Sequence, residues 1–168
     1  MTADIFTKST LNCIIQLNPG EYNNSIDDIL LEKLKSKVEG KCDSFGYIKP
    51  DSAQIIKRSI GMLAQSDFRG LAEYRIVYSV DVCNPVEGMI VKCIVRNINK
   101  MGLFCELAEE SPSPLSLILA KQHHLRNDKF ELVKINDIIS VEVVGIKFNY
   151  NDTNISCIGK LSSHDLTM

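Results

Sequence analysis

The sequence predicts an α+β unit over residues 1–84, followed by an all-β unit over residues 85–168. Two observations predict this division. A stretch with helical spacing of apolar residues lies in the first half, whereas the second half alternates apolar and polar residues in short runs. Pro85 stands where one pattern gives way to the other. A chain of 168 residues has room for two small domains, so we expect a boundary there.

The first unit is expected to begin with a strand and a helix. Leu11 to Leu17 is an apolar run rich in β-forming residues, and residues 18–20 (NPG) end it with turn chemistry. Ser25 is expected to cap the helix with Asp28 as its capping-box partner, and Gly40 is expected to end it. The predicted apolar face of the helix consists of Ile26, Ile29, Leu30, Leu34 and Val38.

Three further strand-like runs complete the first unit, and a turn is expected between Gly61 and Gly70. These runs are Cys42 to Lys49, Ser52 to Leu63, and Leu71 to Val82. Met62, Leu63 and Phe68 lie in or near the turn, where polar residues are the rule. An exposed apolar tip suits docking on a partner, because interface hot spots are buried apolar anchors. Packing in a satellite core is the other interpretation of these three residues.

The second unit shows five short strands with a helical turn between the third and the fourth, which is typical of an OB-type barrel. Met89, Val91, Cys93 and Val95 share one face of the first strand. The helical turn contains His123 and His124 and is expected at the surface. The expected strands are Met89–Asn97, Leu103–Leu107, Leu115–Ala120, Ile138–Phe148 and Asn154–Leu161.

The composition excludes several classes of protein. Apolar residues make up 45% and charged residues 24% of the chain, with a net charge of −2, so the chain is neither mainly disordered nor suited to coating duplex DNA by charge. We expect no membrane span and no signal peptide. The six cysteines form no C-x-x-C pair, so buried reduced thiols in a reducing, intracellular compartment are expected.

Catalytic motifs are missing from the sequence. It has no phosphate-binding G-x-x-x-x-G-K-[ST] and no G-x-S-x-G nucleophile motif. The adjacent His123 and His124 point in different directions on a helical turn and make a poor metal site. We therefore expect a binding protein with no catalytic residues, no metal site and no cofactor.

The order of several short motifs resembles a known family. Residues 86–91 (VEGMIV) and 102–107 (GLFCEL) are similar to the opening of S-one-type OB domains. In the first half, residues 38–49 (VEGKCDSFGYIK) and 72–77 (AEYRIV) precede them in the order found in the stalk subunits of DNA-dependent RNA polymerase. That family includes the seventh subunit of eukaryotic RNA polymerase II and its archaeal counterpart. The resemblance covers nearly the whole chain and rests on collinearity, because each motif alone is short.

The resemblance implies a non-catalytic subunit acting in transcription. An N-terminal tip domain would dock on the polymerase core and on a helical, fourth-subunit-like stalk partner. An S-one-type OB-fold domain would lie near the RNA exit path and touch nascent single-stranded RNA. By position in the family and by the turn argument above, the candidate docking residues are Pro19, Gly20, Gly40, Gly46, Tyr47, Met62, Leu63 and Phe68.

Candidate RNA-binding residues lie in the second half, and each has a structural alternative. Cationic Lys92, Arg96 and Lys100 could bind phosphate or line a solvated barrel face. Phe104 could stack on a base or fill the barrel core. Met101 stands where RNA-binding S-one domains carry an aromatic residue, and we expect at most weak, salt-dependent RNA binding. A second cluster, beside the turn before the last strand, consists of Lys147, Phe148 and Tyr150, which could bind RNA or pack against the turn.

One rival function stays open at this point. A free-standing OB-fold RNA-binding factor in translation or RNA turnover would use the same barrel, but it would be stable without a partner for the first half. The abundance of Ile, Asn and Lys favours an AT-rich genome such as that of a large DNA virus. The expected location is then the nucleus, a viral cytoplasmic factory or the virion.

Overall fold

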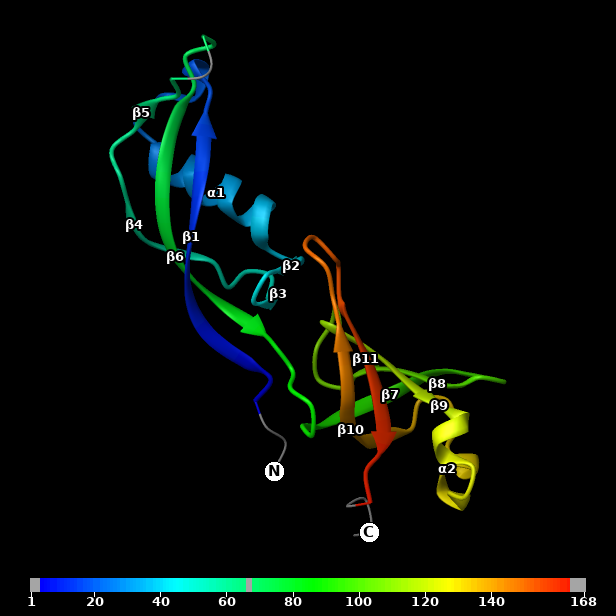
Figure 1. The fold of residues 1–168 in the computed structure, drawn as a ribbon. Helices are drawn as coiled ribbons and strands as arrows, with labels where there is room; N and C mark the ends of the chain where they lie inside the picture. Colours follow the sequence, from blue (N-terminus) through cyan, green and yellow to red (C-terminus); the bar gives the residue numbers. More distant parts are fainter. Residues whose placement is uncertain (1–3, 66–67, 164–168) are drawn as a thin grey trace.

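The computed structural model describes residues 4–65 and 68–163. These residues form an open sheet covered by helix α1, followed by a closed β-barrel (Figure 1). None of the helices in these ranges is long and apolar enough to cross a membrane. In chain order the elements are β1 (Phe6–Leu17), η1 (Pro19–Glu21), α1 (Ile26–Val38), β2 (Cys42–Asp43), β3 (Gly46–Ile48), β4 (Gln54–Arg58), β5 (Met62–Leu63), β6 (Ala72–Cys83), β7 (Ile90–Asn99), β8 (Gly102–Leu107), β9 (Leu115–Ala120), η2 (Lys121–His124), α2 (Asp128–Leu132), β10 (Ile138–Lys147) and β11 (Ile155–Leu161).

Strand β6 is the central strand of the first sheet. It pairs antiparallel with β1 along its whole length, from Phe6 opposite Cys83 to Leu17 opposite Ala72. Its other edge pairs with β3, β4 and β5, while β2 pairs with β3. Alternate residues of β6 point to one face, as a pleated strand requires, and those between Ala72 and Val82 on that face are buried.

Helix α1 covers the buried face of this sheet. Leu30 and Leu34 of α1 are fully buried in one apolar cluster with side chains of β1 and β6, which confirms the predicted apolar face. The predicted capping box is wrong, because the Ser25 side chain makes no capping bond. Ser25 is not in the extended conformation of an N-cap, and its N–H is held by Asn23 Oδ1 at 2.8 Å. Gly40, with φ +69°, follows the C-cap residue, as expected.

The barrel closes in the order β7–β8–β9–β11–β10 and back to β7. Strands β9 and β11 run parallel, and the other neighbouring pairs run antiparallel. This arrangement is consistent with the predicted OB-fold barrel. The interior holds alternate residues of every strand, among them Val91, Cys93 and Val95 of β7, as their sequence pattern predicts.

The connection between β9 and β10 contains more helical structure than predicted. The helical turn η2 forms as expected, but a second helix, α2, follows it. His124 is buried, not at the surface. Its Nδ1 lies 2.8 Å from the carbonyl oxygen of Ala120, its Nε2 accepts the N–H of Leu161 at 3.0 Å, and its ring stacks on Phe130. His124 thus joins the connection to the last strand of the barrel.

Two long strands predicted in the first half are divided. Residues 42–49 form the two-stranded hairpin β2–β3, with Cys42 opposite Tyr47. Residues 52–63 form β4 and the very short β5, and β4 carries a register shift between Ile55 and Lys57. A turn at residues 44–45 divides the first run, and residues 59–61, which include Gly61, separate β4 from β5 in the second.

The sheet and the barrel are joined by buried side chains. Cys42, Tyr47 and Cys83 belong to the apolar cluster that fills the barrel. The backbone of Cys42 also exchanges two hydrogen bonds with the β10–β11 loop, to Asp152 at 2.7 Å and from Asn151 at 2.8 Å. The expected boundary near Pro85 falls between β6 and β7, and the division of the chain into two domains there stays a prediction.

Candidate docking surface and nucleic-acid interface

Two loops meet at the end of the first sheet that lies far from the barrel (Figure 1). One loop follows β1 and the other joins β5 to β6. Met62 and Leu63 are 62% and 71% exposed, and Phe68 is fully exposed. We call this region the apical surface; it consists of Pro19, Gly20, Tyr22, Met62, Leu63 and Phe68.

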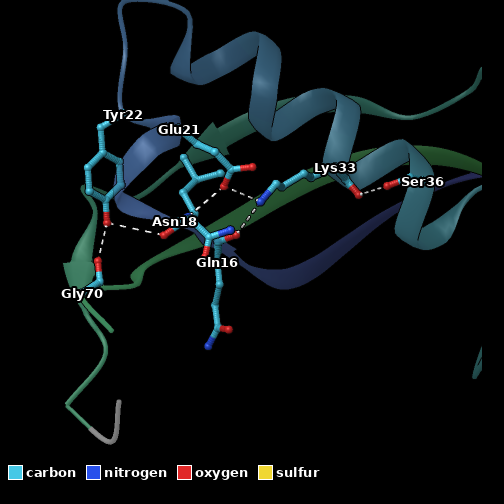
Figure 2. A network of polar contacts seen from close by, with 8 residues as sticks. Gln16, Asn18, Glu21, Tyr22, Lys33, Ser36 and Gly70 are labelled. Atoms are coloured by element: carbon cyan, nitrogen blue, oxygen red, sulfur yellow. Dashed lines mark hydrogen bonds and ion pairs between the residues drawn. The ribbon is translucent and has the colours of Figure 1, made fainter. Parts of the chain in front are cut away.

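A polar network holds the two loops together (Figure 2). The hydroxyl of Tyr22 donates a hydrogen bond to the carbonyl oxygen of Gly70 at 2.8 Å. Gly70 has φ +72°, and a Cβ there would come within 3.3 Å of the Pro19 ring. The close approach of the two loops therefore depends on glycine at position 70.

Glu21 and Lys33 fix the first loop to helix α1. The carboxylate of Glu21 accepts the N–H of Asn18 at 2.8 Å and lies 2.7 Å from Lys33 Nζ. Lys33 Nζ also donates to the carbonyl oxygen of Gln16 at 3.1 Å. The hydrogen bond from Lys33, followed by the one from the Asn18 backbone, lowers the pKa of Glu21. The exposed apolar side chains thus lie beside a loop, residues 18–22, that is bonded both to helix α1 and to Gly70.

Three of the predicted docking residues lie at the opposite end of the sheet. Tyr47 is only 2% exposed and packs in the barrel cluster, so its side chain offers no surface to a partner. Gly46 has φ +135°, and a Cβ there would lie 2.3 Å from the carbonyl oxygen of Cys83. Gly40 ends helix α1 beside the same hairpin, its N–H bonded to the Ile48 carbonyl oxygen. These three residues shape the join between sheet and barrel and are not part of the apical surface.

Phe104 lies on the outer face of the barrel. Its neighbours Leu103 and Cys105 are buried, while Phe104 itself is half-buried and stands opposite Ile118 of β9. The core interpretation of Phe104 is therefore wrong. Base stacking at this position stays a prediction.

The three cations of the first predicted RNA patch are dispersed. Arg96 Nε donates to Glu106 Oε2 at 2.9 Å, which neutralises its charge locally. Lys92 stands opposite Ser140 of β10, and Lys100 lies in the exposed β7–β8 turn. They do not form one compact phosphate site.

The second predicted RNA patch is also divided. Phe148 packs against the barrel cluster, which agrees with the turn-packing alternative. Tyr150 is exposed and lines a cavity of about 270 Å³ between the sheet and the barrel, together with Asn12 and Tyr78. Lys147, at the end of β10, is exposed opposite Ser156. Phe148 therefore packs on the barrel, whereas Tyr150 lies beside residues of the sheet, and RNA binding by this cluster stays a prediction.

Sequence reasoning missed Tyr22 and Ile60. Tyr22 is 40% exposed beside the turn, and Ile60 is 80% exposed just before β5. Both could have been predicted from the sequence, because each is a large apolar or aromatic residue close to turn-forming residues.

The thiols are poor nucleophiles. All six cysteines lie among the described residues and are free. Burial raises the pKa of Cys42 to about 11 and the pKa of Cys105 and Cys157 to about 12, so these side chains stay protonated at neutral pH. Among residues 4–65 and 68–163, no group of three or more His, Cys, Asp and Glu is placed to hold a metal ion.

Comparisons with known proteins find relatives that are named as subunits of DNA-directed RNA polymerase. No protein-family profile matches the chain. A protein named as a subunit of DNA-directed RNA polymerase in Acanthamoeba polyphaga mimivirus is 26% identical over 94% of this chain and 82% of its own length. DNA-directed RNA polymerase II subunit RPB7 of Glycine max is 26% identical over 88% of this chain and 86% of its own length.

A third relative aligns over a shorter stretch. DNA-directed RNA polymerase II subunit rpb7 of Schizosaccharomyces pombe is 31% identical over 61% of this chain and 59% of its own length. The first two alignments span both the sheet and the barrel, so the likeness is not confined to the OB module. The resemblance predicted from the sequence is thereby confirmed: the chain is a homologue of the seventh subunit of RNA polymerase II.

Proposed function

We propose that this chain is a non-catalytic stalk subunit of a DNA-dependent RNA polymerase and acts in transcription by binding. The observation that carries the proposal is the relationship to polymerase subunits across 88–94% of the chain. A similarity limited to the barrel would not distinguish a polymerase subunit from many other RNA-binding proteins. The added match of the first sheet favours a polymerase subunit over a free-standing RNA factor.

The apical surface is the proposed anchor on the polymerase core. Its exposed side chains, Met62, Leu63 and Phe68, are of the apolar kind that forms interface anchors. The hydrogen bond from Tyr22 and the Glu21–Lys33 pair hold the loops in place before binding, which reduces the entropy lost on association. We place the anchor at this end of the sheet because the opposite end is occupied by the barrel.

The remaining partners follow from the family. We propose that the chain binds the largest core subunits and a fourth-subunit-like stalk partner, and that the barrel lies near the path of nascent RNA. The dispersed cations of the barrel support only weak contact with RNA. The nucleus or a viral factory is the proposed site of action.

Purification of the tagged chain from its native source tests this function. We expect the two largest polymerase subunits to be recovered by mass spectrometry in amounts equal to the tagged chain. Recovery of ribosomal or RNA-decay proteins without polymerase would contradict the proposal and favour the free-standing RNA-binding factor.

A further inference from the structure

The side chain of His124 bridges the ends of two barrel strands. Strands β9 and β11 pair in parallel as far as Ile118 opposite Ile158. Beyond this ladder, Nδ1 of His124 lies 2.8 Å from the carbonyl oxygen of Ala120, and Nε2 lies 3.0 Å from the backbone nitrogen of Leu161. Ala120 and Leu161 are the last residues of the two strands. The imidazole ring therefore connects β9 to β11 where their own pairing has ended.

These two partners fix the protonation state of the ring. A carbonyl oxygen can only accept a hydrogen bond, so Nδ1 must carry a hydrogen to bond Ala120. A backbone N–H can only donate, so Nε2 must offer its lone pair to Leu161. The neutral ring with its proton on Nδ1 is the form that meets both conditions. A protonated ring carries a hydrogen on each nitrogen and would place two donors against each other at Leu161.

The surroundings of His124 do not supply a partner for a charged ring. The residue is 5% exposed, and its ring stacks on the buried ring of Phe130 with the centroids 4.4 Å apart. Both ring nitrogens are bonded to the backbone, and neither is bonded to a carboxylate within the described residues. The neutral form is therefore the one that this site accommodates.

Charged groups on the neighbouring elements are exposed or already paired. Lys121 lies 4.0 Å from Glu131, and Glu106 of β8 is bonded to Arg96. The thiols nearby on β8 and β11 are buried, and His164 and Asp165 lie outside the described residues. The other titratable or charged groups on η2, α2, the loop between them and β11 are exposed; they are His123, Arg126, Asp128, Lys129 and Lys160.

We propose that His124 is a pH-sensitive switch that holds the η2–α2 connection against the last strand of the barrel. At neutral pH the uncharged ring accepts the N–H of Leu161 and covers Phe130, which belongs to the barrel core. Histidine becomes charged in mild acid, and the charged ring loses this acceptor. The connection then separates from β11. The inference uses only contacts within the barrel and does not rest on the polymerase assignment.

Nuclear magnetic resonance of the isotopically labelled full chain tests the switch. The nitrogen chemical shifts of the imidazole report which nitrogen carries the proton, and we expect Nδ1 at neutral pH. From about pH 8 to about pH 5.5, the protection of the Leu161 amide against hydrogen exchange should fall at least about tenfold, after correction for the intrinsic effect of pH. The Ile155 amide, bonded to the Pro114 carbonyl oxygen at 2.8 Å at the start of β11, should keep its protection.

Variants separate His124 from the other two histidines of the chain. His124→Gln offers an amide oxygen that accepts a hydrogen bond but does not titrate, so the protection of Leu161 should not depend on pH. His124→Phe keeps an aromatic ring beside Phe130 but has no acceptor, and it should lower the protection at every pH. His123→Gln and His164→Gln are the matched controls and should show the pH dependence of the natural chain. An unchanged pattern of amide signals elsewhere verifies that each variant is folded.

Three results would overturn the inference, and the first two need no variant. One is an imidazole that carries its proton on Nε2 at neutral pH. Another is a Leu161 amide in the natural chain whose protection is the same at both pH values. The third is a loss of protection in acid that persists in His124→Gln or disappears in either control, which would assign the titration to another group.

Discussion

The two ends of β6 differ in what surrounds them, although they belong to one continuous strand. At Ala72 the strand follows the loop of the apical surface, where Phe68 is fully exposed. At Cys83 it enters the apolar cluster of the barrel, where Tyr47 is only 2% exposed. Position in the family suggested docking at both ends. At the barrel end the predicted docking side chain, Tyr47, is buried, whereas at the apical end Met62, Leu63 and Phe68 are exposed.

The comparison separates a binding end from a structural end. The two loops at the first end are joined by a polar contact, the bond from Tyr22 to Gly70, while the apolar side chains there stay exposed. Apolar residues at the second contribute to stability through burial. Substitutions at the apical end should therefore alter binding, and substitutions at the barrel end should alter folding.

The largest effect is expected at the barrel end. Tyr47→Ala should lower the free energy of unfolding by about 3–5 kcal/mol, because it leaves a cavity the size of a buried aromatic ring. Urea denaturation measures this change. Phe45→Ala is the matched control: it removes an aromatic ring in the same hairpin, but one that is 58% exposed, and should have a small effect. Equal losses in the two variants would contradict the distinction between the ends.

The second effect is expected at the apical end. The double variant Met62→Asp, Phe68→Asp should weaken binding to purified polymerase core by about 2 kcal/mol or more, because charge replaces apolar anchors. Its free energy of unfolding should stay within about 0.5 kcal/mol of the natural value. Ile138→Asp, an exposed apolar position on the barrel, serves as the control for binding. Unchanged core affinity in the double variant would remove the apical surface from the docking site.

A smaller effect is expected from the polar network. Tyr22→Phe removes the hydrogen bond to Gly70 and should lower stability by about 1 kcal/mol. Amide hydrogen exchange should speed up in the β5–β6 loop while β11 stays protected. A uniform increase throughout the chain would show that Tyr22 supports the whole fold and not the apical loops in particular.

The smallest effect concerns pH. The pKa of Glu21 is lowered in the folded chain from its ordinary value of 4.5, so its carboxylate stabilises the fold above that pH. The stabilisation should be lost as the pH falls through the folded pKa and the carboxylate becomes protonated. The melting temperature of the natural chain should be higher than that of Glu21→Gln at neutral pH. The difference between the two melting temperatures should disappear in acid. A difference in melting temperature that does not change with pH would contradict a role for the ionised carboxylate.

The sequence predicted the elements that follow a regular period. The β7 pattern, with Cys93 and Val95 facing inward, and the apolar stripe of α1 with Leu30 and Leu34 both form as expected. Periodicity carries this information because it records which side chains face a core.

Features that depend on tertiary neighbours were not predictable in the same way. The burial of His124 depends on the backbone of Leu161, which is distant in sequence, and on the ring of Phe130, which belongs to helix α2. The breaks between β2 and β3 and between β4 and β5 were a different case, because Asp43, Ser44 and Gly61 offered a turn signal that was not used. The outward direction of Phe104 follows from barrel register. For the candidate site, the turn around Met62 was found as an anomaly of composition, whereas its contact with the loop of Tyr22 required the fold.

The most direct test of docking through the apical surface is site-specific photo-cross-linking within the purified polymerase complex. A cross-linking amino acid at Leu63 samples the apical surface, and one at Phe45 samples an exposed position at the other end of the sheet. Docking through the apical surface predicts cross-links from position 63 to the largest core subunits and far fewer from position 45. Cross-links to the core from position 45 alone, in a complex that still contains the chain, would contradict it.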